Sequence, residues 1–532
     1  MTFLRYLLKE KSFWWPYIKS LPQPSELSIP SLWSQRDQAF FNGTNVEPAL
    51  SKRQVLWQFE YEQALSHFSK QSGDWQDYTL DIYKWAAVIF GSRSFRPSLT
   101  ISPSLFDEEI EDGKGDLIKS HISNDTFSVL YPVLDIGNHN AADRMRWTHG
   151  DHSFSLSSMR DFQAGEQVYN FYGNKSNSEL LVGYGFLLED DALDRVNIKL
   201  NNLPQEVKDY RRTQSNHILP SPNQPEEEFM YFVGQSNHQE ESRVLPYLSQ
   251  GLLDSVIYLV ANDRERNHIR HQTNWCPEQD QEIFVGELNR CAHVARHIIE
   301  EKVQAELERL VATDPGYVVL HLRKFQFKKD LTAFSPPQKP YQEVATTYRH
   351  RTKVLLNHAL TQLQAIPSPG LLSLETAYTW LCQHIPHVYS KLEQYIADDQ
   401  EETLPLKWDV FIEDWDHTYL LIWIYIILSQ QLSDPEFFPE SHIVFNENWL
   451  KPVSELADNS KLYAEQGEID TIDGTIEFVA GLFGHREDES VRLRNMASHI
   501  LKVESVRGLL RAPGQPVQEM LCIPGLQLIL DS

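Results

Sequence analysis

The sequence predicts an α+β fold in which a short strand-rich region lies between long helical segments. β-Branched and aromatic runs gather between residues 127 and 173, and apolar residues recur at helical spacing before and after this region. The longest apolar run, 419–428, is too short to cross a bilayer. With 532 residues, 41% hydrophobic and 23% charged, the chain is globular and long enough for about two to four domains.

The elements follow one another in a readable order. Residues 1 to about 90 predict helices joined by polar loops that contain proline and serine. Three short strands are then expected, because FSVLYPVLDI is rich in β-branched and aromatic residues, SFSLSSM alternates, and EQVYNFYG ends in glycine. Amphipathic stretches at about 281–312 and 341–366 predict long helices. The apolar run at 419–428 predicts a buried helix.

Charge and cysteine content limit the partners and the compartment. The net charge of −26 opposes direct nucleic-acid binding and favours a basic or lysine-presenting protein partner, although acidic runs are most often only solvated surface. None of the four cysteines forms a C-x-x-C pair. We therefore expect reduced thiols, no metal site and a cytoplasmic or nuclear protein. The N-terminus has no secretory-signal pattern, and we expect no membrane partner. The oligomeric state is open.

Four short motifs lie in the strand-rich region and just before it: Gly91–Phe95, Asp135–His139, Ala164–Gly173 and Asn174–Phe186. Each motif alone has a simpler explanation. An Asn-His pair after a strand is usually a turn, a Tyr-Gly pair is usually a strand end, and a single arginine is usually a surface ion pair. Their order and joint spacing, however, resemble the C-terminal half of the SET domain in the Rubisco large-subunit lysine methyltransferase subgroup.

The clear resemblance covers about residues 80–200. It implies a SET-type array of small β-sheets with a large helical insertion, an all-α substrate-binding domain and a helical C-terminal extension. The implied segments are an N-terminal helical part and insertion of an incomplete SET domain, the C-terminal half of that domain, the substrate-binding domain, and an extension of unknown role, at 1–126, 127–203, 204–368 and 369–532. Such domains open with a glycine-rich G-x-G turn, which does not occur here before the insertion, so we expect a cofactor-binding N-terminal segment to be missing.

The resemblance further implies S-adenosylmethionine as cofactor and N-methylation of a lysine side chain in a non-histone protein. The implied cofactor-binding residues are Arg93, Asn138, His139, Tyr172 and Phe186. The implied substrate-binding residues are Phe95, Asp135 and Tyr184. Tyr172 would also be catalytic, because its hydroxyl would align the amine. Phe186 is equally compatible with plain core packing.

Methyl transfer explains why such residue types are suitable. The nucleophile must approach the sulfonium methyl group in line at about 3 Å, so alignment is the main requirement. A lysine with a pKa of about 10.4 must first lose a proton, which a narrow apolar channel beside a positive charge favours. Tyrosine hydroxyls and ring faces can then orient the amine.

Two alternatives remain open. One is histidine methylation, although Phe95 and Leu134 stand where the actin-histidine branch has asparagine and tryptophan. An imidazole needs a polar partner for its second nitrogen, and a phenylalanine supplies none. The other alternative is a catalytically inactive SET-like module that binds protein and cannot hold the cofactor.

Overall fold

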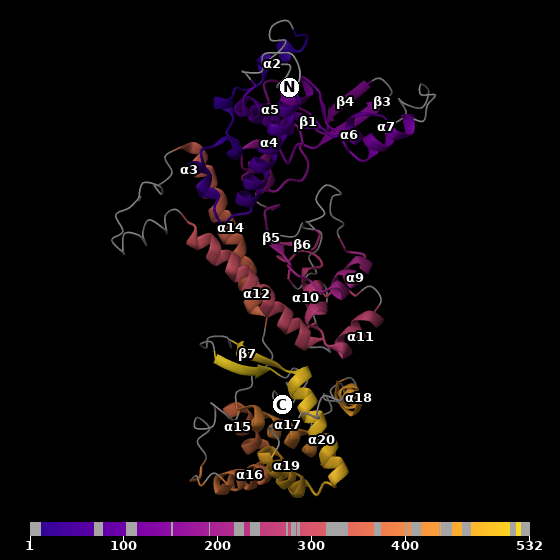
Figure 1. Cartoon of the computed structure of the whole chain (residues 1–532), viewed down its shortest axis with the longest axis vertical. Helices are drawn as coiled ribbons and strands as arrows, with labels where there is room; N and C mark the ends of the chain where they lie inside the picture. Colours follow the sequence, from indigo (N-terminus) through magenta and orange to yellow (C-terminus); the bar gives the residue numbers. More distant parts are fainter. Residues whose placement is uncertain are drawn as a thin grey trace, which may run out of the picture. The chain divides into compact units, whose positions relative to one another are not determined.

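The protein is described by a computed structural model (Figure 1) that covers residues 12–68, 78–102, 114–150, 153–190, 192–217, 228–234, 245–272, 275–277, 283–284, 288–314, 339–366, 374–399, 401, 403–405, 416–435, 437, 449–459, 470–510 and 518–522. The predicted α+β class is confirmed, since helices are accompanied by small two-stranded sheets. The chain forms two compact units. Unit 1 comprises Met1–Asn197, Phe232–Gln239 and Gln304–Ala359, and unit 2 comprises Ile198–Tyr231, Glu240–Val303 and Leu360–Ser532.

Unit 1 contains most of the N-terminal helices. They are α2 (Trp15–Ser20), α3 (Gln35–Gln38), α4 (Val46–Phe68), α5 (Leu80–Arg93), α6 (Pro97–Thr100), α7 (Lys114–Ser123) and α8 (Asn177–Tyr184), with 3-10 turns at Pro24–Glu26, Pro30–Leu32 and Ala39–Phe41. The helical prediction for the first 90 residues is thus confirmed where the structure describes them; residues 1–11 lie outside the described part.

A shared apolar core ties distant parts of unit 1 together. Phe41 and Val46 near the start of α4 pack with Leu181 of α8 and with Tyr348 of α14 (Pro340–Ala365). Leu181 and Phe41 are fully buried. Burying such side chains stabilises the fold by about 1.5–3 kcal/mol each. The helix α8, which carries part of the fourth sequence motif, is therefore fixed from two sides.

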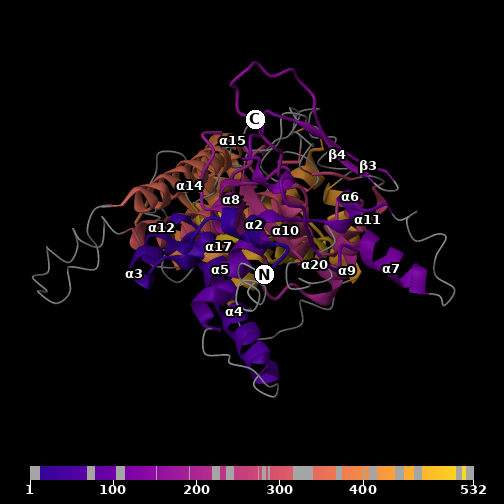
Figure 2. The same cartoon turned by 90° about the horizontal axis from the view of Figure 1, so that it is seen from above.

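The strands of unit 1 are short and antiparallel. β1 (Ser94–Phe95) pairs with β2 (Val129–Leu130), and β3 (Met145–Gly150) pairs with β4 (Ser153–Ser158). β4 alternates in burial, as SFSLSSM predicts. In both Figure 1 and Figure 2 the β3–β4 hairpin lies beside α6.

Two of the predicted strands differ from expectation. FSVLYPVLDI forms only the two-residue β2, because Pro132 has no N–H to donate and Val133 adopts a φ of 82°; a 3-10 turn, η6 (Leu134–Ile136), follows. EQVYNFYG is a loop rather than a strand. Its backbone bonds to the 138–140 segment rather than to a strand, as in the bond from Asn170 N to Asn138 O at 2.7 Å and the isolated parallel bridge between His139 and Asn170.

Unit 2 contains most helices of the middle and C-terminal parts of the chain. Its helices are α9 (Gln205–Thr213), α10 (Leu252–Val260), α11 (Asp263–His271), α15 (Leu374–His384), α16 (Pro386–Asp399), α17 (Asp416–Ser433), α18 (Lys451–Asn459), α19 (Asp470–Phe483), α20 (Glu487–His499) and the π-helical turn η12 (Ile500–Glu504). The segments predicted as helical also contain strands. In unit 2, β7 (Val506–Leu510) pairs with β8 (Gln518–Cys522), and β6 (Met230–Gly234) pairs with β5 (Arg195–Lys199), two strands whose residues are divided between the units.

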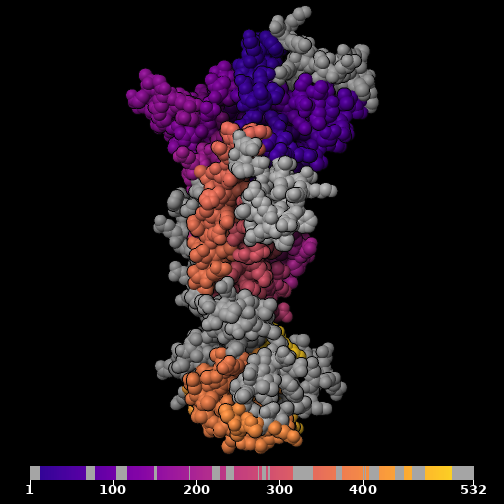
Figure 3. Space-filling view, turned by 90° about the vertical axis from the view of Figure 1, so that its left-hand side faces the viewer, coloured from indigo at the N-terminus to yellow at the C-terminus, as the bar shows by residue number. Residues whose placement is uncertain are grey.

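The two predicted amphipathic helices are confirmed as α12 (Asn289–Ala312) and α14. They lie side by side, as Figures 1 and 3 show. Within unit 1, Arg349 of α14 donates to Leu310 O of α12, and within unit 2, Arg296 donates to Leu363 O at 3.0 Å. The two helices are therefore joined near both of their ends by arginine side chains that donate to backbone carbonyl groups of the other helix.

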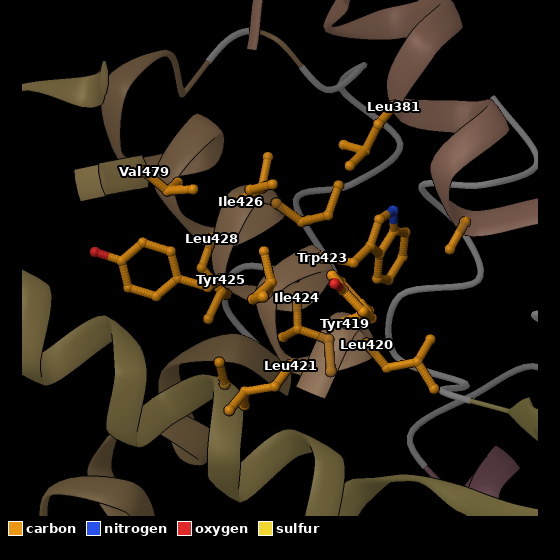
Figure 4. Packing of buried hydrophobic residues seen from close by; sticks show 14 of the residues in the cluster. Leu381, Tyr419, Leu420, Leu421, Trp423, Ile424, Tyr425, Ile426, Leu428 and Val479 are labelled. Carbon is orange, nitrogen blue, oxygen red and sulfur yellow. The ribbon is translucent and has the colours of Figure 1, made fainter. Parts of the chain in front are cut away.

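The core of the C-terminal part of unit 2 is built around α17. Every residue from 419 to 428 is buried, and Trp423 and Tyr425 are fully buried (Figure 4). Around them pack residues of α15, α19 and α20, among them Leu381 and Val479. This confirms the predicted buried helix. Among the described residues, no helix has the length and apolar character that a membrane span requires.

Candidate active site

Five of the eight predicted site residues line one pocket of about 560 Å³ in unit 1. They come from all four sequence motifs, so the motif pattern corresponds to a shared cavity. These five residues are Arg93, Phe95, Asp135, Tyr172 and Tyr184. The other three do not line this pocket, and they are Asn138, His139 and Phe186.

Asp135 is held inside the pocket wall. Its side chain is 0% exposed, and its Oδ2 accepts a hydrogen bond from the Tyr17 hydroxyl at 2.5 Å and lies 3.5 Å from Arg93 Nη1. Arg93 also donates to the backbone oxygen of Asp135 at 3.0 Å. Burial, and the neighbouring Asp135 carboxylate, raise the pKa of Tyr17, which therefore stays protonated as a donor. Asp135 thus shapes the pocket by fixing Arg93.

Tyr172 is tied to the motif that contains Asp135. Its hydroxyl donates to Gly137 O at 2.8 Å, and its backbone N–H donates to His139 Nδ1 at 3.1 Å. Gly137 also allows Asn170 of the same loop to pack closely, because a Cβ at Gly137 would lie 3.1 Å from the Asn170 Cβ. Burial raises the pKa of Tyr172. The ring position and the protonated hydroxyl are therefore both fixed.

An aromatic cluster extends from the pocket wall. The Tyr172 ring lies 4.7 Å from Tyr184 and stacks on His139 at 5.1 Å, and Phe186 lies 6.2 Å from Tyr184 and 6.4 Å from His139. Burial raises the pKa of Tyr184 to about 12. Burial lowers the pKa of His139, so its imidazole is neutral near pH 7 with the proton on Nε2. Tyr172 and Tyr184 contact both the pocket and this cluster.

Two predicted residues have different surroundings. Asn138 is exposed, and its side-chain amide makes no hydrogen bond with any residue in the described ranges. Phe95 lies in β1 with its ring 5.3 Å from Trp147 and 5.9 Å from Tyr131. The amide of Asn138 is therefore available to a ligand, and the Phe95 ring forms an apolar side of the pocket.

The sequence motifs did not reveal Tyr17, which bonds to a pocket residue, or several of the residues that line the pocket. Tyr17 lies 118 positions before its partner Asp135, so no local pattern connects them. Trp147 and Met145 project from β3 into the pocket, and the alternation of that strand could have indicated one inward face. Arg96 directly follows the first motif and carries no pattern of its own.

Comparison with known proteins gives sequence relatives that are protein methyltransferases. No protein-family model matches the chain. It is 31% identical to the ribosomal lysine N-methyltransferase set10 of Schizosaccharomyces pombe over 193 residues. The matched region covers 36% of this chain and 31% of that protein. It is 29% identical to the actin-histidine N-methyltransferase of Rhinolophus ferrumequinum over 211 residues. This matched region covers 38% of this chain and 32% of that protein. The chain thus spans about a third of the length of these relatives.

Among solved structures, the chain is similar to Rubisco LSMT bound to AdoMet, with 19% identity and a TM-score of 0.43 over 68% of this chain and 72% of that chain. It is also similar to the SET domain of LSMT bound to MeLysine and AdoHcy, with 18% identity and a TM-score of 0.40 over 68% and 73% of the two chains. Over the part of its sequence that matches set10, the chain is therefore a relative of the SET-type protein methyltransferases.

Proposed function

We propose that this protein transfers a methyl group from S-adenosylmethionine to the side-chain nitrogen of a lysine in a protein substrate. The observation that carries the proposal is the double contact of Tyr172, which lines the pocket and also stacks on the His139–Phe186 cluster. A group bound at the cluster and an amine in the pocket would thus meet at one tyrosine. Alignment of this kind is what methyl transfer requires.

The Tyr172 hydroxyl is arranged to orient an amine. Its proton is used in the bond to Gly137 O, so its oxygen lone pairs remain to accept an N–H from the incoming lysine. The raised pKa values of Tyr172 and Tyr184 keep both hydroxyls neutral at physiological pH. A deprotonated phenolate would instead stabilise the ammonium form, which is not nucleophilic. Neutral tyrosines therefore favour the reactive free amine.

The residues of the cluster fit the proposed cofactor. A sulfonium compound is cationic, and the neutral His139 ring with the Phe186 and Tyr184 rings offers aromatic faces to such a group. The exposed Asn138 amide provides a donor and an acceptor for a purine edge. When bound, the cofactor supplies the methyl group on a positively charged sulfur.

Lysine is preferred over histidine as the target because of Phe95. Its ring packs against Tyr131 and Trp147 and supplies no polar partner for the second nitrogen of an imidazole. Histidine remains the second candidate, since proteins named actin-histidine N-methyltransferase are among the sequence relatives.

The test is a transfer experiment with the purified chain, S-adenosylmethionine labelled in its methyl group, and a cell lysate depleted of endogenous cofactor. The labelled protein is hydrolysed to amino acids, which separates methyllysine from methylhistidine. A Tyr172→Phe preparation controls for contaminating enzymes. Methyllysine formed only by the unaltered chain supports the proposal, and methylhistidine supports the second candidate. Absence of protein labelling, together with no cofactor binding by calorimetry, would favour the non-catalytic alternative.

A further inference from the structure

The outer part of the pocket is positively charged, although the whole chain has a net charge of −26. Arg96 is exposed and Lys175 is half-buried, and both line the pocket. Neither is within ion-pair distance of a carboxylate in the part of the chain that the structure describes. Lys175 Nζ instead lies 6.0 Å from the centre of the Tyr184 ring.

The carboxylates of the pocket are already engaged elsewhere. Asp135 is buried and paired with Arg93 and Tyr17. Glu179 closes the N-terminal capping box of α8, where its Oε2 accepts from Ser176 N at 2.9 Å, and it lies 3.6 Å from Arg195. Neither acidic group is within ion-pair distance of Arg96 or Lys175.

A third cation lies beside these two. Arg144 is exposed, its guanidinium lies 4.2 Å from the centre of the Phe171 ring, and its Nη1 is 3.5 Å from Asn174 Oδ1. Phe171 and Asn174 both line the pocket. No carboxylate of the described ranges pairs with Arg144. Two cations that pair with no described carboxylate thus line the pocket, and a third, Arg144, lies against two of the lining residues.

We propose that the pocket selects a protein segment in which acidic residues stand next to the target residue. This inference rests on the proposed function and adds the substrate class. Guanidinium and ammonium groups donate charge-assisted hydrogen bonds to carboxylates, and the same charges repel basic neighbours of the target. Long-range attraction by the acidic chain as a whole would favour basic proteins, but at the opening of the pocket the nearest charges decide which flanking residues fit.

Direct binding tests the selection without requiring turnover. Three fluorescent nine-residue peptides share a central lysine and differ only at the two positions on each side of it. One peptide carries glutamate at these four positions, one carries glutamine and one carries arginine. Fluorescence polarisation with the whole chain, at low and moderate salt, should rank them glutamate, glutamine, arginine. Each exposed charge contact is expected to change affinity by about twofold to fivefold, and added salt should reduce the difference.

Substitutions assign the preference to the named cations. Arg96→Gln and Lys175→Gln should each reduce binding of the glutamate peptide and leave the glutamine peptide unchanged. Arg146→Gln is the matched control, because Arg146 is an exposed arginine of β3 that does not line the pocket. Equal affinity for glutamate and glutamine peptides, or an equal effect of the control, would overturn the inference. Tighter Arg96-dependent binding of a single-stranded oligonucleotide would overturn it as well. Failure of the proposed function would show separately, as absent methyl transfer with the charge preference intact.

Discussion

At the scale of residues, the hydroxyl of Tyr172 is the group whose loss should affect the chemistry most. Tyr172→Phe keeps the ring contacts with His139 and Tyr184 and removes the oxygen that would orient the amine. We expect the transfer rate to fall by about tenfold to a thousandfold with little change in cofactor affinity. Single-turnover kinetics and calorimetry measure the two quantities.

Tyr169→Phe is the matched control for this substitution, because Tyr169 lies in the same loop and does not line the pocket. An unchanged transfer rate in Tyr172→Phe would assign Tyr172 to packing alone.

His139 gives a prediction about pH. Burial lowers its pKa below the ordinary 6.5, so the unfolded chain takes up this proton before the folded chain does. The contribution of neutral His139 to stability is therefore complete above about pH 6.5 and decreases as the pH falls below it. Protonation would also put a hydrogen on Nδ1, which now accepts from Tyr172 N.

We expect the unaltered protein to lose more thermal stability between pH 7.5 and 5.5 than His139→Gln, which cannot take up a proton. Differential scanning calorimetry measures both proteins. The lowered pKa values of His217, His293, His485 and His499 act in both proteins and cancel in the comparison. An equal loss in the two proteins would show that the His139 bond does not depend on protonation.

Motif spacing predicted pocket residues only within the four motifs. Arg93, Phe95, Asp135, Tyr172 and Tyr184 line one cavity. Tyr17, which fixes Asp135, could not be found because its contact depends on the packing of α2, 118 positions earlier. The roles assigned to the eight residues stay predictions until they are tested.

At the scale of elements, the two glycines around Tyr184 have opposite requirements. Gly185 ends α8 with a φ of +83°, and a Cβ there would lie 2.8 Å from the backbone of Ser28. Gly183 lies within the helix, and a Cβ there would meet nothing within 4 Å. We therefore expect Gly185→Ala to destabilise the protein by about 1–3 kcal/mol and Gly183→Ala to stabilise it by about 0.5–1 kcal/mol.

Chemical denaturation followed by circular dichroism measures both changes. Equal effects of the two substitutions would show that the end of α8 is not held against Ser28.

Element prediction succeeded where burial imposes a period on the sequence. α17 follows from a continuous apolar run and α12 and α14 follow from amphipathic spacing. The structure adds a capping box at the start of α8, which Ser176 and Glu179 form three positions apart. The 166–173 loop was predicted as a strand because its composition is strand-like, but Asn170 N donates to Asn138 O, Tyr172 N donates to His139 Nδ1, and Asn170 O accepts from Asn140 N. Composition does not reveal which partner a backbone group will have.

At the scale of the whole molecule, the predicted substrate-binding segment 204–368 contributes to both compact units. Residues 304–359 belong to unit 1, where Ala345 and Tyr348 share a core with Phe41. Deleting 204–368 would therefore remove packing from the unit that contains the pocket. The predicted segment boundaries stay predictions, and substitutions are better tests of docking than deletions.

Unit 2 is joined across a long stretch of sequence by buried charges. Glu504 is 1% exposed, and it accepts from Arg264 Nη2 at 3.0 Å and from Asn262 Nδ2 at 3.0 Å. Arg290 donates to Glu265, the neighbour of Arg264, at 3.0 Å. The bond between Arg264 and Glu504, which stand 240 positions apart, thus connects α11 with the turn η12 that follows α20.

Glu504→Gln should therefore destabilise unit 2. Burial alone would raise the pKa of Glu504, but Arg264 and Arg290 lower it below the ordinary 4.5. A lowered pKa means that the carboxylate contributes its stability above about pH 4.5 and loses it as the pH falls through the folded value. Without the Glu504 carboxylate, buried Arg264 keeps only the more distant Glu265, whose Oε1 lies 3.8 Å from Arg264 Nη2 and already accepts from Arg290. Breaking a buried ion pair by removing one partner costs about 3–5 kcal/mol. We expect that loss of stability at pH 7 in urea unfolding followed by tryptophan fluorescence, and a smaller difference from the unaltered protein at pH 4.

Glu487→Gln is the control, because Glu487 is an exposed carboxylate at the start of α20. This substitution should change the free energy of unfolding by less than about 0.5 kcal/mol. A difference that does not shrink at acidic pH would mean that Glu504 acts by packing and hydrogen bonding and that its charge is not required.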